Sequence, residues 1–121
     1  MSIHPHIFEV DEEGFAERVL AQSAERPVLV DFAADWCAPC RFLAPVITQV
    51  MDEYAGQVVL AKLDTDENMR LAGRYKVRGF PTVVLFIDGE EVDRFDGAKP
   101  AAFIRDFIDF HLHADERGQT A

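Results

Sequence analysis

The chain has 121 residues, 49% of them hydrophobic, and a formal net charge of −10. This length predicts a single compact domain and leaves no room for a second one. The acidic balance argues against binding to nucleic acid or to an anionic membrane surface, because both present phosphates that need basic side chains. No apolar run approaches the roughly 20 residues of a membrane-spanning helix.

The N-terminal residues lack the basic segment and apolar run of a secretory signal peptide, so a cytoplasmic location is expected. The surface should be strongly acidic and self-repelling, and we expect a monomer. The core should span about residues 8–112, with polar tails at both ends and a frayed C-terminal segment at 114–121.

The first half of the chain predicts a helix, a strand and a second helix. A helical pattern covers residues 12–22, and Asp11 can accept hydrogen bonds from its first turn. The apolar run at 28–33 is expected to be a strand buried on both faces. The segment from the cysteines to Tyr54 repeats apolar residues every four positions, which is typical of an amphipathic helix.

The second half predicts a strand, a helix, a hairpin and a closing helix. Asp88-Gly89 is a strong signal for a two-residue hairpin turn, and Pro100 suits the first turn of a helix. The expected elements are a strand at 58–63, a helix from Asp64 to about Tyr75, strands at 82–87 and 91–95, and a helix after Pro100. A helix-crossed parallel pair followed by an antiparallel hairpin gives an α/β fold with a mixed sheet.

Both cysteines lie in one Cys-x-x-Cys, Cys37 and Cys40, between a buried strand and a helix. Residues three apart on a helix have Cα atoms about 5 Å apart, which suits a disulfide. The free N–H groups and the helix dipole should stabilise a thiolate at Cys37, whereas Cys40 should be buried and less acidic. We therefore expect Cys37 to attack a substrate disulfide and Cys40 to resolve the mixed disulfide.

Other functions of the cysteine pair require additional residues that are absent beside it or lie far from it in the sequence. A c-type haem site requires His directly after the second cysteine, where Arg41 stands. Trp36 before the pair and Pro39 within it disfavour two inert, buried cysteines. A structural zinc site stays open but requires four ligands. The histidines that could complete it lie near the termini, at His4, His6, His111 and His113.

Residues 30–40, with the sequence Val-Asp-Phe-Ala-Ala-Asp-Trp-Cys-Ala-Pro-Cys, resemble the active-site stretch of the thioredoxin family. The other matching motifs are Ala61-Lys62-Leu63-Asp64, Gly79-Phe80-Pro81-Thr82, Asp88-Gly89 and Phe95-Asp96-Gly97-Ala98. Their order and spacing hold from about Phe8 to Leu112. The resemblance implies that residues 1–121 form one thioredoxin-like domain, a mixed sheet of about five strands flanked by about four helices.

The same resemblance implies a protein-disulfide reductase that works through a dithiol–disulfide cycle of Cys37 and Cys40. Its partners would be protein disulfide substrates and a thioredoxin-reductase-like flavoenzyme that recharges it, within electron transport and cell redox homeostasis. Neither a bound cofactor nor a metal is expected, only the redox-active disulfide. Two alternatives stay open: a disulfide isomerase or oxidase of the same fold, and a chaperone-like or scaffolding domain with secondary redox activity.

The resemblance also implies roles for residues around the pair. Asp31 would be a buried carboxylate that takes the proton of Cys40, and Lys62 on the adjacent strand would pair with Asp31 and tune it. Pro81 would be cis and face Cys37, with backbone nearby free to pair with an extended substrate. The implied substrate-binding rim consists of Trp36, Ala38, Pro39, Gly79, Phe80, Gly97 and Ala98.

Three residues depart from the family's usual pattern. Ala38 replaces a glycine between the cysteines, Ala33 replaces a bulky aromatic residue, and Phe80 stands where a smaller aliphatic residue is common. The residues within the Cys-x-x-Cys influence the redox poise through the helix turn and the thiolate. We expect these departures to affect the choice of client and the reduction potential while leaving the chemistry intact.

Overall fold

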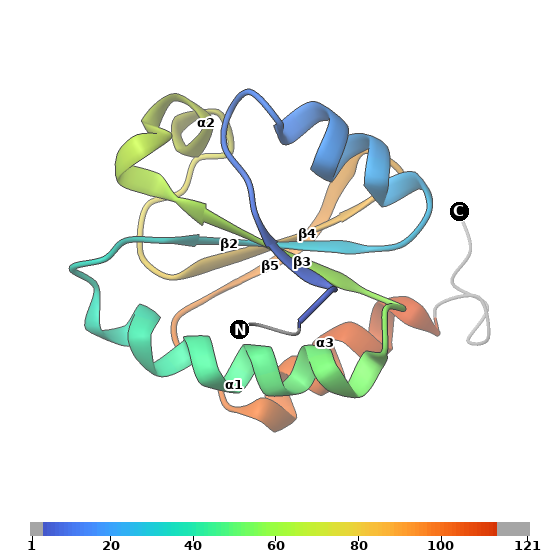
Figure 1. Ribbon diagram of the computed structural model, residues 1–121. Helices are drawn as coiled ribbons and strands as arrows, with labels where there is room; N and C mark the ends of the chain where they lie inside the picture. Colours follow the sequence, from blue (N-terminus) through green and yellow to red (C-terminus); the bar gives the residue numbers. More distant parts are fainter. Residues whose placement is uncertain (1–3, 114–121) are drawn as a thin grey trace.

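The computed structural model describes residues 4–113, in which a mixed sheet lies between two layers of helices (Figure 1). The strands are β1 (Ile7–Glu9), β2 (Val28–Ala33), β3 (Val59–Asp64), β4 (Thr82–Ile87) and β5 (Glu90–Asp96). The α-helices are α1 (Ala38–Tyr54), α2 (Met69–Arg74) and α3 (Ala101–Leu112). Shorter helical segments are η1 (Ala16–Ala21), η2 (Gln22–Ala24) and η3 (Thr65–Glu67). The predicted polar tail at 114–121 lies outside the described residues.

The strand order β1-β3-β2-β4-β5 puts β2 at the centre of the sheet. β1, β3 and β2 are parallel neighbours, whereas β4 runs antiparallel to both β2 and β5. The hairpin turn is the predicted Asp88-Gly89, where both residues have positive φ, of 54° and 82°. Two such residues in succession match the right-handed twist of a hairpin. The predicted thioredoxin fold with its mixed sheet is therefore confirmed.

The two faces of the sheet carry separate hydrophobic cores, because successive side chains of a strand point to opposite faces. Val30 and Phe32 of β2 pack with η1 and α2, whereas Leu29 packs with α1 and α3. Asp31 follows the same alternation as Leu29, so its carboxylate lies on the α1 face. The apolar run that buries β2 on both faces thus also places one carboxylate under α1, the helix that begins between the two cysteines.

Two predicted helices differ in detail from the observed ones. The helix expected at 12–22 begins later, as the π-helix η1 followed by the 3₁₀ segment η2, although Asp11 does accept a hydrogen bond, from the N–H of Gly14 at 2.9 Å. The helix expected from Asp64 to Tyr75 divides into η3 and α2. The break falls at Asn68, which has non-helical dihedral angles.

The side chain of Asn68 explains the break. Its amide group donates to the carbonyl oxygen of Asp64 at 2.8 Å, and its Oδ1 accepts from the N–H of Glu12 at 2.8 Å. Asparagine side chains that bond the backbone compete with helical hydrogen bonding. A helical period in the sequence therefore continues through 64–75, while a contact with a segment 56 residues earlier interrupts the helix itself.

The far end of α1 is fixed to α3 by Tyr54, so we predict that Tyr54→Phe destabilises the fold. The Tyr54 hydroxyl lies 3.2 Å from the carbonyl oxygen of Arg105 and 2.6 Å from Oδ1 of Asp109. Losing these contacts should lower the free energy of unfolding by about 1–2 kcal/mol in urea denaturation. Tyr75→Phe removes a hydroxyl for which no hydrogen bond exists within residues 4–113. Equal losses in the two variants would contradict the assignment.

Candidate active site

The cysteine pair lies where β2 ends and α1 begins. Cys37 and Cys40 form a disulfide, and their Cα atoms are 5.3 Å apart, close to the spacing predicted from helix geometry. Cys37 is the N-cap of α1, and its Sγ accepts a hydrogen bond from the peptide N–H of Cys40 at 3.2 Å. The positive end of the helix dipole points at the same sulfur. This arrangement favours negative charge on Cys37 once the disulfide is reduced.

Solvent exposure does not distinguish the two cysteines in the disulfide form. Cys40 is buried, as predicted, with 7% of its surface exposed, but Cys37 is only 4% exposed. Both pack in a small apolar cluster with Ala34. The difference between the two sulfurs is therefore electrostatic, since the hydrogen bond from the first turn of α1 goes to Sγ of Cys37.

Asp31 is a buried carboxylate in the middle of the sheet. The residue is 5% exposed, and its Oδ1 has no hydrogen-bond partner in the described part of the chain. Burial removes water from the charged form and raises the pKa of Asp31 from 3.8 to about 6, an effect that the positive charge of Lys62 partly opposes. An acid with this pKa can take up and release a proton close to neutral pH.

Lys62 is the β3 residue directly in register with Asp31 of β2. It is half-buried, and it takes part in no ion pair shorter than 4.0 Å within residues 4–113. The predicted pairing of Lys62 with Asp31 is therefore an interaction of charges at longer range rather than a direct contact.

A groove under the start of α1 brings these groups together. It is lined by Asp31 and Lys62 from the sheet and by Cys40 and Arg41 from α1. Ala33, Ala34, Ala44 and Leu63 add apolar surface, while Glu9, Asp35 and Asp64 add negative charge. The groove thus connects the buried carboxyl group with the second cysteine and with solvent.

Trp36 and Phe80 form an aromatic pair beside the disulfide. Trp36 is 64% exposed, and its ring meets that of Phe80 edge-on with centroids 5.5 Å apart. The indole N–H donates to Oδ2 of Asp66 at 2.9 Å, which fixes the orientation of the ring. Phe80 packs against the cluster that contains both cysteines. No local pattern in the sequence indicates Asp66, because its contact with Trp36 spans 30 residues.

The loop that carries Phe80 is joined through Pro81 to Gly97, the residue directly after β5. The Phe80–Pro81 peptide bond is cis, as predicted, and the N–H of Gly97 donates to the carbonyl oxygen of Pro81 at 2.8 Å. Gly97 has a φ of 91°, a conformation that favours glycine. The remaining predicted rim residues are exposed: Ala38, Pro39, Gly79 and Ala98.

Two of the departures from the family pattern meet on one cluster. Ala33 and Phe80 both pack against the cysteines and Ala34. Ala33 removes bulk from this cluster, whereas Phe80 adds an aromatic ring to it. The two departures therefore act on the same apolar cluster beside the disulfide.

The histidines do not converge on the cysteine pair. His4 contacts Asp52 of α1 at 3.0 Å, about 20 Å along the helix from Cys37 at roughly 1.5 Å per residue. His111 instead contacts Asp93 at 2.9 Å. Among residues 4–113 there is no group of three or more side chains arranged to hold a metal ion.

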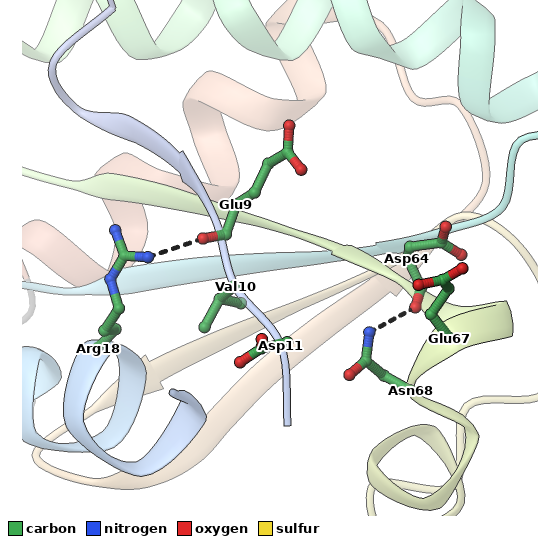
Figure 2. A pocket seen from close by; sticks show the side chains of 7 residues that line it. All are labelled: Glu9, Val10, Asp11, Arg18, Asp64, Glu67 and Asn68. Carbon is green, nitrogen blue, oxygen red and sulfur yellow. Dashed lines mark hydrogen bonds between the residues drawn. The ribbon is translucent and has the colours of Figure 1, made fainter. Parts of the chain in front are cut away.

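A second hollow lies on the other side of β1 and contains neither cysteine (Figure 2). It is lined by Glu9, Val10, Asp11, Arg18, Asp64, Glu67 and Asn68. Arg18 donates to the carbonyl oxygen of Glu9 at 2.9 Å, and Figure 2 shows the carboxylate of Glu9 directed away from the side chain of Val10. The backbone of Glu9 thus belongs to this hollow, while its side chain belongs to the groove beside Cys40.

A mixed sheet that places a Cys-x-x-Cys disulfide at a helix N-terminus, above a buried carboxyl group, defines a class of thiol–disulfide oxidoreductases. The thioredoxin family model matches residues 6–110. A thioredoxin of Chlorobaculum thiosulfatiphilum is 42% identical over 105 residues, covering 87% of this chain and 95% of the relative. Thioredoxin 1 of Synechococcus elongatus is 43% identical over 103 residues, covering 85% and 94%.

An M-type chloroplastic thioredoxin of Pisum sativum is 41% identical over 103 residues, which make up 85% of this chain and 59% of the relative. The chain therefore belongs to the thioredoxin family. Its activity is that of a thiol–disulfide oxidoreductase that reduces protein disulfides. Within residues 4–113, no helix combines the length and the apolar character needed to cross a membrane.

The burial of Asp31 predicts that Asp31→Asn stabilises the oxidised protein above pH 6. Because the pKa of Asp31 rises from 3.8 to about 6 on folding, ionisation costs stability as the pH increases through that window. The gain from Asp31→Asn should reach up to about 3 kcal/mol at pH 7.5 and fall toward zero at pH 4. Urea denaturation at both pH values measures it. A gain of the same size at both values would contradict the ionisation argument.

Proposed function

We propose that this chain reduces cytoplasmic protein disulfides with Cys37 as nucleophile, Cys40 as resolving thiol and Asp31 as the proton acceptor of Cys40. The observation that carries the proposal is the groove that both the buried Asp31 and Cys40 line, together with the hydrogen bond from Cys40 N–H to Sγ of Cys37. The two cysteines thus have different electrostatic surroundings, and each suits one step of the exchange.

In the first step, the Cys37 thiolate attacks one sulfur of a substrate disulfide. A bond forms between Cys37 and that sulfur, the substrate's S–S bond breaks, and the other substrate sulfur leaves as a thiolate that water protonates. The N-terminus of α1 supports this step because it stabilises the attacking thiolate at neutral pH.

In the second step, Cys40 transfers its proton to the Asp31 carboxylate and attacks Sγ of Cys37. The intramolecular disulfide forms, the mixed disulfide breaks, and the substrate leaves as a second thiolate. The substrate gains two electrons and this chain loses two. A pKa of about 6 leaves Asp31 ionised at pH 7, so that it is ready to accept the proton.

The surface around the disulfide suits an extended substrate segment. Trp36 and Phe80 offer apolar surface, and within residues 4–113 no hydrogen bond uses the peptide N–H or carbonyl oxygen of Phe80. An extended chain could pair with these backbone groups as an added strand. Ala38, Pro39, Gly79, Gly97 and Ala98 would complete this rim.

The cycle closes when a reductase returns two electrons to the Cys37–Cys40 disulfide. We assign this step to a thioredoxin-reductase-like flavoenzyme, because the disulfide must be reduced by a donor with a matching two-electron chemistry. The net charge of −10 favours a monomer that remains apart from its own copies. Electron transport from that reductase to protein disulfides would then be the role of the chain.

Cysteine variants separate the two thiol roles. Cys37→Ser should abolish turnover of insulin disulfides, since the nucleophile is lost. Cys40→Ser should attack once and then accumulate a mixed disulfide on Cys37, visible as a mass increase that dithiothreitol removes. Multiple turnovers by Cys37→Ser, or clean release of substrate by Cys40→Ser, would overturn the assignment of roles.

The role of Asp31 is tested on the second step alone. Asp31→Asn should slow release of a preformed mixed disulfide by roughly 10- to 100-fold at pH 7, because the proton acceptor for Cys40 is missing. Stopped-flow measurement from pH 5 to 9 should also show loss of a kinetic pKa near 6. Asp35→Asn, an exposed carboxyl group lining the same groove, is the matched control and should change little. An unchanged rate in Asp31→Asn would refute the role.

A further inference from the structure

Three charged side chains form a row across the parallel part of the sheet. Glu9 of β1 is in register with Lys62 of β3, and Lys62 is in register with Asp31 of β2. Residues in register on neighbouring strands point to the same face, and strands lie about 4.8 Å apart. The row therefore alternates negative, positive and negative, and it runs from the edge of the sheet to its centre.

All three side chains line the groove that also contains Cys40. Their exposure decreases along the row: Glu9 is exposed, Lys62 is half-buried and Asp31 is buried. Lys62 thus lies between the exposed carboxylate of Glu9 and the buried carboxyl group of Asp31.

The edge strand that carries Glu9 is held in place on both sides. The N–H of Val10 donates to the carbonyl oxygen of Lys62 at 2.9 Å, and Arg18 donates to the carbonyl oxygen of Glu9 at 2.9 Å. Val10 packs into the core on the opposite face, which leaves the Glu9 side chain on the α1 face (Figure 2). The position of Glu9 in the row is therefore fixed by backbone contacts and by the packing of its neighbour.

Lys62 forms no direct ion pair with either carboxylate, so its ammonium group responds to both. The geometry points to Glu9 as a positioning residue that attracts the ammonium group of Lys62 toward the open end of the groove and so weakens its action on Asp31. This inference rests on the role proposed above for Asp31. It adds an exposed residue on the first strand to the machinery of the second step.

The sign of the effect follows from the charges. Lys62 favours the ionised form of Asp31 and lowers its pKa, whereas burial raises it. Loss of the Glu9 charge would leave Lys62 free to act on Asp31 and would also remove a nearby negative charge. Both changes lower the pKa of Asp31.

The other charged groups that line the groove with Asp31 are Asp35, Asp64 and Arg41, while Cys40 is held in the disulfide. The strand on the other side of β2 places the apolar Val83 in register with Asp31. These groups stay the same in the variants below, so a change in the pKa of Asp31 reports on the row itself.

The test is a carboxyl ¹³C NMR titration of Asp31 in the oxidised protein. In Glu9→Gln the pKa of Asp31 should fall by about 0.5, the size expected for one charge roughly 10 Å away in a partly hydrated groove, together with the released Lys62. In a Lys62→Met background the same substitution should cause less than half of that fall. Glu13→Gln, an exposed carboxylate outside the groove, is the matched control and should leave the titration unchanged.

Either of two results would overturn the inference: an unchanged pKa of Asp31 in Glu9→Gln, or an equal fall with and without Lys62. In the second case Glu9 acts directly through its field and positions nothing. A supporting result should also shift the pH profile for release of the mixed disulfide to lower pH by the same amount.

Separate measurements test the proposed role of Asp31 and the inference about Glu9. If Asp31→Asn leaves release of the mixed disulfide unchanged, the catalytic role of Asp31 fails while the titration still measures the charge row. If Asp31→Asn slows release but Glu9→Gln leaves the titration unchanged, the inference about Glu9 fails alone.

Discussion

The site depends on one structural constraint, that α1 begins directly after Cys37. Because β2 ends only a few residues earlier, the chain enters the helix with the first sulfur at its N-terminus and the second one turn inside. The Cys40 N–H then reaches Sγ of Cys37, and Cys40 lines the groove over the sheet. If the helix began one residue earlier or later, both sulfurs would point away from their present directions, since each residue rotates the helix by about 100°.

The sheet supplies the carboxyl group of Asp31 to the site, and burying this group lowers the stability of the folded state. β2 is hydrogen-bonded on both sides, so the backbone of Asp31 is held in the interior of the sheet when the carboxyl group ionises. A buried charge without a contact partner weakens the folded state, and the raised pKa is the measure of that cost. The same burial brings the pKa close to neutral, where proton transfer is most useful. Stability and proton transfer thus oppose each other at this residue.

Local sequence patterns predict the parts of the molecule that local physics determines. The run at 28–33, the Cys-x-x-Cys at a helix start and the Asp88-Gly89 turn were each predicted from neighbours in the chain. The break at Asn68 was missed because its partner Glu12 is distant in sequence. β1 was not located, since three residues carry no alternation to recognise. Glu9 joins the groove only through the register of that strand.

In the proposed mechanism, the two steps of the exchange draw on different sources of electrostatic stabilisation. The thiolate of Cys37 is supported by a peptide N–H and a helix terminus, which substitution of a neighbouring side chain leaves in place. Asp31 depends on burial and on the charge of Lys62, whose side chain lines the same groove as Glu9. In that mechanism, attack on the substrate and release of the product are separable, because side-chain changes in the groove would alter the second step without removing the support for the first.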